Sequence, residues 1–152
     1  MIFNIGVVAF SFLLLLYWFR YTCVLMLRTK PVRDYSKQVA AANRLNVFEV
    51  RSRLTAAAGG GNIQGLDELQ SMLDRDYRLL MFLMGHAASF KTAGYEMEQT
   101  MLKLNYHIVK RAYALSKRFS IAQGSERLSE MAAIIAHFAN LMGERAESAA
   151  AQ

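Results

Sequence analysis

Three histidines, one cysteine and two nearby glutamates are the residues of this sequence whose types could support catalysis or metal binding. A helical bundle can hold a di-iron centre where Glu-x-x-His pairs face one another. The residues three positions before His86, His107 and His137 are leucine, leucine and isoleucine, so that pattern is missing. A metal- or haem-bearing helical enzyme that uses these histidines is the third of three hypotheses.

The other motifs that carry chemistry are also missing from the sequence. It has no His-Glu-x-x-His, no Cys-x-x-Cys and no haem-attachment motif, and the run 59–61 lacks the Gly-Lys-Ser/Thr ending of a phosphate-binding loop. Glu96 and Glu98 are two positions apart and therefore point to different faces of a helix. We expect no catalytic residue, no cofactor and no metal, and a protein that is not an enzyme.

The N-terminal segment has the properties of a membrane anchor. Residues 2–19 carry no charge, and twelve of these eighteen residues are Leu, Ile, Val or Phe. Their side chains supply about −4 to −7 kcal/mol toward insertion. No Lys or Arg precedes the segment and no Ala-x-Ala site follows it, as a cleaved signal peptide requires. We therefore expect an uncleaved transmembrane helix over residues 1–30, with an interfacial extension.

Aromatic and basic residues mark the end of this span and its orientation. Aromatic rings at the headgroup level and cations beyond them are typical of a membrane boundary. The positive-inside rule places the N-terminus outside and the rest of the chain in the cytoplasm. The predicted membrane-interface residues are Tyr17, Trp18, Arg20, Tyr21, Arg28, Lys30 and Arg33.

The net charge of +6 belongs to the stretch that leaves the membrane. Residues 20–58 contain eight basic and two acidic residues, whereas residues 59–152 contain ten of each. A basic segment next to a span is attracted to anionic lipid headgroups at about 1 kcal/mol per residue near the surface. We expect contact with anionic lipid and no binding of nucleic acid.

The rest of the chain has helical periodicity and no alternating strand pattern. We expect an all-α fold in which a cytoplasmic antiparallel bundle of three or four helices follows the single span. Residues 31–58 form a basic juxtamembrane helix with Asp34 as its N-cap, residues 59–65 a Gly-rich linker and residues 66–152 the bundle domain. A last helix starts after Gly124 with Ser125 as its cap.

Each bundle helix has an apolar row that we expect to face the core. The rows recur at steps of three and four residues. They are Leu66, Leu69, Leu73, Tyr77, Leu80 and Met84; then Met101, Leu104, Ile108, Ala112, Leu115 and Phe119; then Leu128, Met131, Ile135, Phe138 and Met142.

Two further rows offer more apolar surface than one core needs. A compact bundle could bury them itself, or they could dock on another protein chain, because a large exposed apolar patch is unusual on a soluble monomer. The candidate partner-contact residues are Leu102, Tyr106, Val109 and Tyr113, followed by Ala132, Ala136, Ala139 and Gly143.

A basic face with Lys103, Lys110 and Lys117 runs along the same segment as the first of these rows. We expect a solvated face that pairs partly with Asp67, Asp74 and Asp76; contact with lipid phosphates or an acidic partner is the alternative.

Taken together, these patterns predict a non-catalytic, single-pass membrane protein. The first hypothesis is an accessory, scaffold or assembly subunit of a larger membrane complex, which uses its helical bundle for contacts with other protein subunits. The second is a stand-alone regulatory module that binds an anionic lipid surface.

Overall fold

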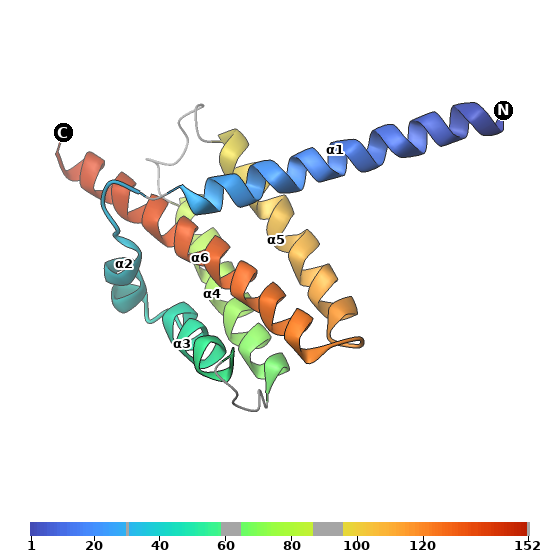
Figure 1. The fold of residues 1–152 in the computed structure, drawn as a ribbon. Coiled ribbons are helices and arrows are strands. Elements are labelled where there is room, and N and C mark those ends of the chain that lie inside the picture. Colours follow the sequence, from blue (N-terminus) through green and yellow to red (C-terminus); the bar gives the residue numbers. More distant parts are fainter. Residues whose placement is uncertain (30, 59–64, 87–95, 152) are drawn as a thin grey trace. The chain divides into compact units, whose positions relative to one another are not determined.

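The computed structural model describes residues 1–29, 31–58, 65–86 and 96–151, and all structural statements refer to these residues. Six helices and no strand occur among them, which confirms the all-helical prediction (Figure 1). The helices are α1 (Ile2–Arg28), α2 (Ser36–Asn43), α3 (Val47–Ala58), α4 (Leu66–His86), α5 (Glu96–Ser116) and α6 (Ile121–Ala150).

The chain divides into two units, Met1–Lys30 and Pro31–Gln152, which we describe separately. The first unit is α1, whose large apolar side chains are exposed from Phe3 to Leu16. The hydroxyl of Ser11 donates to the carbonyl of Val7 at 2.9 Å, so this polar group is satisfied within the helix. Among the described residues, α1 is the one helix long and apolar enough to cross a membrane.

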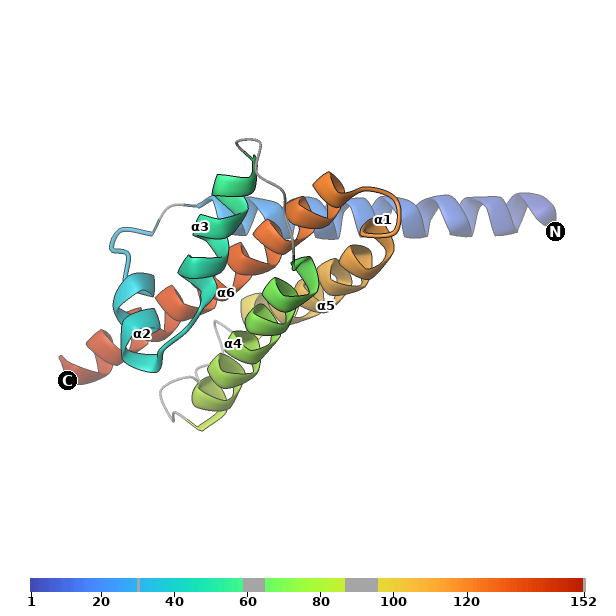
Figure 2. The ribbon, with the colours of Figure 1, turned by 90° about the horizontal axis from the view of Figure 1, so that it is seen from below.

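The second unit is organised around α6, which contacts each of α2, α3, α4 and α5 (Figure 2). All of its large apolar side chains from Leu128 to Leu141 are buried, since it meets neighbours on several sides. The predicted core rows of α4 and α6 are largely confirmed, because only Leu66 and Met142 remain partly exposed. The buried side chains of α6 are Leu128, Met131, Ala132, Ile134, Ile135, Phe138, Ala139, Asn140 and Leu141.

Where the sequence predicts one helix over residues 34–58, the structure has two. Arg44 ends α2 in the left-handed conformation (φ 52°, ψ 45°), and the amide of Leu45 donates to the carbonyl of Ala40 at 2.9 Å. This is the Schellman arrangement, in which a glycine normally occupies the left-handed position. No Gly or Pro marks the break, so helical periodicity alone could not locate it. The predicted N-cap is also wrong, because Tyr35 and not Asp34 occupies that position of α2. Asp34 lies one residue earlier, and its carboxylate accepts from the amide of Ser36 at 3.0 Å.

The start of α6 also differs from the prediction. The helix begins at Ile121 after an extended Ser120, so Gly124 and Ser125 lie inside its first turns. A Cβ atom at Gly124 would lie 3.5 Å from Leu66 and 3.6 Å from Tyr113. These are ordinary van der Waals distances, so Gly124 is a buried helix position and not a helix boundary. The proposed Ser125 cap is wrong, since its hydroxyl donates to the carbonyl of Ala122.

The face of α5 that is buried differs from the predicted one and lies about 100–150° around the helix from it. Of the expected core row, Leu104, Leu115 and Phe119 are exposed and the other three residues are only partly covered. The row of Leu102, Tyr106, Val109 and Tyr113, expected to be spare, is fully buried. The reason lies in the polar groups that the tyrosines reach on α4.

Candidate functional site

Two clusters of the same composition join α4 to α5. In the first, named the Asp74 cluster, the hydroxyl of Tyr106 donates to Asp74 Oδ1 at 2.8 Å and the ammonium of Lys110 pairs with Oδ2 at 2.8 Å. The ring of Tyr106 stacks on that of Tyr77 with centroids 3.9 Å apart. Burial and the neighbouring Asp74 carboxylate raise the pKa of the Tyr106 phenol far above its usual value, so this phenol remains a donor.

The second cluster, named the Asp67 cluster, repeats the first at a distance of seven residues on both helices. The hydroxyl of Tyr113 donates to Asp67 Oδ1 at 3.1 Å, and Lys117 Nζ lies 2.7 Å from the same oxygen. The Lys117 hydrogen bond, followed by that of Tyr113, lowers the pKa of the Asp67 carboxyl. Partial pairing of the lysine face with aspartates of α4 was predicted, and Lys110 and Lys117 form such pairs.

Long side chains, rather than close backbones, hold α4 and α5 together. No Cα atoms of these two helices come within 8 Å of one another. Tyrosine rings and Asp–Lys pairs fill the space between them in the two clusters. Beyond the two clusters, part of the space between these helices stays open.

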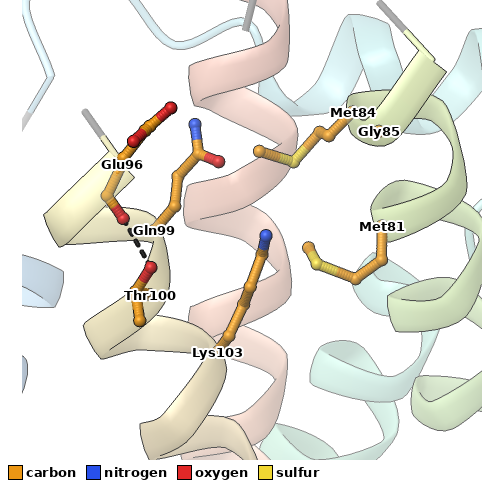
Figure 3. A pocket seen from close by; sticks show the side chains of 7 residues that line it. All are labelled: Met81, Met84, Gly85, Glu96, Gln99, Thr100 and Lys103. Carbon is orange, nitrogen blue, oxygen red and sulfur yellow. Dashed lines mark hydrogen bonds between the residues drawn. The ribbon is translucent and has the colours of Figure 1, made fainter. Parts of the chain in front are cut away.

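Such an open space lies between the ends of α4 and α5 (Figure 3). The pocket has a volume of about 310 Å³. The side chain of Gln99 is buried, and its Nε2 has no hydrogen-bond partner among the described residues. The lining residues are Met81, Met84, Gly85, Glu96, Gln99, Thr100 and Lys103.

The three histidines lie in different places and do not form a common site. His86 Nδ1 contacts the carbonyl of Phe82 at 2.8 Å, and the exposed His107 meets the rings of Tyr77 and Tyr106 edge-on. His137 Nε2 lies 2.9 Å from Glu98 Oε1. Among the described residues, no three His, Cys, Asp or Glu side chains group as metal ligands.

Seven of the eight candidate partner-contact residues are buried within the helical unit, which agrees with the alternative that a compact bundle buries both rows itself. Leu102, Tyr106, Val109 and Tyr113 face α4 and α6, and Ala132 and Ala139 are fully buried. Gly143 is also buried and Ala136 is half-buried. A Cβ at Gly143 would clash with Tyr35 and lie 3.3 Å from Val39 Cγ2. The start of α2 therefore packs on the end of this row of α6.

A different apolar surface is exposed on α5. We name it the exposed row: Met97, Leu104, Leu115 and Phe119, which are 53–82% exposed. Arg111 and Arg118 come from the same stretch and form no ion pair within the described part of the chain. The spacing in the sequence had already grouped Leu104, Leu115 and Phe119 in one apolar row, although that row was expected to face the core.

Six of the predicted membrane-interface residues belong to the first unit, Met1–Lys30, and Arg33 belongs to the second. On α1, the rings of Tyr17, Trp18 and Tyr21 pack on one another with centroids 6.0–6.5 Å apart. Arg20 and Arg28 are on the same helix, and Lys30 lies outside the described residues. Arg33 pairs with Glu147 of α6 at 2.9 Å in an exposed position.

Compared with protein-family models, curated proteins and solved structures, the chain matches none of them. Its function must therefore be inferred from its own residues. The features that bear on function are the apolar α1, the exposed row and the pocket between α4 and α5.

Proposed function

We propose that the protein is a non-catalytic accessory or scaffold subunit of a larger membrane protein complex. In this proposal α1 anchors the chain and the helical unit that follows docks on another subunit. The exposed row on α5 is the observation that carries the proposal. Four large apolar side chains on one helix and its following turn are costly to leave in water unless something covers them.

The orientation of the chain is part of the proposal. The basic residues Arg20, Arg28, Lys30 and Arg33 follow the span closely. The positive-inside rule then favours an N-terminus outside and a helical unit of α2–α6 in the cytoplasm.

The exposed row indicates the chemistry of the partner surface. From Met97 to Leu115 it extends along about 27 Å of helix at 1.5 Å per residue. Arg111 and Arg118 flank the apolar side chains and have no ion-pair partner among the described residues. A complementary subunit surface has an apolar centre and carboxylates at its rim, because such charges orient the docking and exclude wrong partners.

Co-purification from the native membrane tests this function. We expect the full-length chain in mild detergent to retain one or more membrane subunits in fixed stoichiometry. Leu104→Glu with Leu115→Glu should abolish that association, since the carboxylates would place charge in the apolar centre. Ser71→Glu, at an exposed site on α4, is the matched control and should retain the subunits.

Three outcomes of this experiment count against the proposal. They are a wild-type protein that purifies as a bare monomer, a double variant that keeps its subunits, and a Ser71→Glu control that loses them. Circular dichroism of all three proteins establishes that helical content is unchanged.

The second candidate function is a module that acts alone on an anionic lipid surface. The concentration of eight basic residues in 20–58 favours it, because these residues lie next to the proposed span. It predicts that a dye on Leu104→Cys, in a Cys23→Ser background, enters an apolar environment in anionic bilayers and leaves it at high salt. A dye that reports water in such bilayers at low salt excludes this function for the exposed row.

A further inference from the structure

The register between α4 and α5 reveals a third position that is related to the two clusters. The two clusters are related by a step of seven residues, forward along α4 and backward along α5. On α4 this step leads from Asp67 to Asp74. On α5 it leads from Tyr113 to Tyr106 and from Lys117 to Lys110. The next step of seven leads to Met81, Gln99 and Lys103. All three of these residues line the pocket.

At this third position the donors are present and the carboxylate is missing. Met81 stands where Asp67 and Asp74 stand in the clusters. Gln99 takes the place of the tyrosine and is only 8% exposed, and its Nε2 has no partner among the described residues. A buried N–H donor that lacks an acceptor destabilises the fold, so a ligand that supplies one is favoured.

Lys103 completes the resemblance to the clusters. Lys110 and Lys117 both form ion pairs with aspartates, whereas Lys103 forms none in the described part of the chain. Figure 3 shows the Lys103 side chain extending from α5 toward the Met81 side chain on α4. The ammonium therefore lies on the side where the clusters hold their carboxylate.

Among the described residues, no carboxylate forms an ion pair with Lys103. Glu96 lines the pocket, but Figure 3 shows its carboxylate turned away from Lys103, and the two form no ion pair. The hydroxyl of Thr100 donates to the main-chain carbonyl of Glu96 at 2.7 Å and so is already engaged. The connecting sequence 87–95 contains neither Asp nor Glu.

We propose that this pocket binds a small carboxylate, which takes the place of the missing aspartate. One carboxylate oxygen accepts from Gln99 Nε2, and the ammonium of Lys103 pairs with the carboxylate, as Tyr and Lys do in the clusters. A short apolar tail lies against Met81 and Met84. The volume of about 310 Å³ is at the lower end of the range for small-molecule sites. This site is independent of the exposed row and of docking on a subunit.

Titration of the full-length protein in detergent with sodium butyrate tests the proposal. Sodium chloride at equal ionic strength is the salt control. We expect butyrate to raise the Tm with a saturating dose dependence and to shift the side-chain NH2 resonances of Gln99. Lys103→Met should weaken the butyrate affinity by about tenfold or more, because it removes a charge-assisted contact. Lys37→Met, an exposed lysine of α2, should leave the affinity unchanged.

A second variant, Met81→Asp, tests the register itself. If the third position corresponds to the clusters, the new carboxylate completes it, so the Tm rises without ligand and butyrate no longer has an effect. This test remains decisive if Lys103→Met fails to fold.

The proposal is overturned if butyrate acts no differently from sodium chloride, or if Met81→Asp binds butyrate as the wild type does. Inorganic phosphate that binds where butyrate does not would show that the ligand class is wrong.

Discussion

Asp67, Asp74 and Asp76 lie close together in the sequence of α4 but occupy different environments. The first two accept from a tyrosine and pair with a lysine of α5. Asp76 faces α3 instead, is 1% exposed, and accepts from the main-chain amide of Asn46 at 2.6 Å and from Asn46 Nδ2 at 3.0 Å. It therefore caps the start of α3 from another helix, a role that no local spacing in the sequence could indicate.

Burial gives Asp76 a pH dependence opposite to that of the exposed Asp67. Burial raises the pKa of Asp76, although hydrogen bonds from Asn46 partly oppose this. Between the ordinary value of 3.8 and the raised pKa, the folded protein holds a proton that the unfolded chain has released. The contribution of Asp76 to stability is therefore larger at acidic pH and is lost as the pH rises through the folded pKa.

Asp76→Asn isolates this effect. We expect the Tm of the wild type, measured relative to Asp76→Asn at the same pH by circular dichroism in detergent, to increase as the pH is lowered from neutrality toward about 4. A difference in Tm that stays constant or decreases over this range contradicts the assignment.

At the scale of elements, α5 shows why periodicity predicts a helix without predicting its orientation. Its two apolar rows have similar spacing, and either could face a core. The polar ends of Tyr106 and Tyr113 decide between them, because both hydroxyls reach aspartates of α4 only when their row faces inward. The predicted core rows of α4 and α6 are largely buried, and on α6 most of the second row is buried as well, because neighbours surround that helix on several sides.

Substitution of neighbouring leucines measures which row forms the core. Leu102→Ala should lower the free energy of unfolding by about 2–5 kcal/mol, since it leaves a cavity beside buried neighbours. Leu104→Ala, on the exposed row, should change it by no more than about 0.5 kcal/mol. Chemical denaturation followed by circular dichroism gives both free energies of unfolding. Equal losses for the two variants would contradict a structure in which Leu102 is buried and Leu104 is exposed.

The contact between α2 and α6 depends on a glycine. The amide of Tyr35 donates to Asn140 Oδ1 at 2.7 Å, which brings the start of α2 onto α6 beside Gly143. The row of Ala132, Ala136, Ala139 and Gly143 indicates an apolar surface that something covers, but its spacing does not show that the covering segment belongs to the same chain.

Gly143→Ala tests this close approach. The added methyl group would clash with Tyr35, and we expect a loss of about 1–3 kcal/mol in the free energy of unfolding. Gly85→Ala is the matched control, because nothing lies within 4 Å of its added Cβ and alanine favours helix by about 0.5–1 kcal/mol. If Gly143→Ala and Gly85→Ala have the same free energy of unfolding, α2 does not pack against Gly143.

At the scale of the whole molecule, composition and periodicity predicted the apolar N-terminal helix, the ends of α4 and the absence of strands among the described residues. They could not predict the break at Arg44. A glycine in the left-handed position would have indicated the end of a helix, whereas an arginine there does not. The pocket also required the register between two helices, which spacing within each helix does not give.

The proposed orientation predicts which side of the membrane exposes α6. Ser148 is exposed near the end of that helix and can carry a single cysteine in a Cys23→Ser background. A membrane-impermeant maleimide should label Ser148→Cys only after the membrane is opened. Labelling in intact cells would place the helical unit outside.

The most direct test of the account is whether residues 3–19 stay in the membrane as part of the chain. Membranes that contain the native protein are washed with alkaline carbonate, and the pellet is analysed by mass spectrometry. We expect the protein in the pellet, with peptides from 3–19 still attached to the helical unit. Val8→Arg with Leu14→Arg should release it, because each arginine costs about 2.5–3.5 kcal/mol near the bilayer centre. A mature wild-type protein found in the supernatant without residues 3–19 would contradict the account.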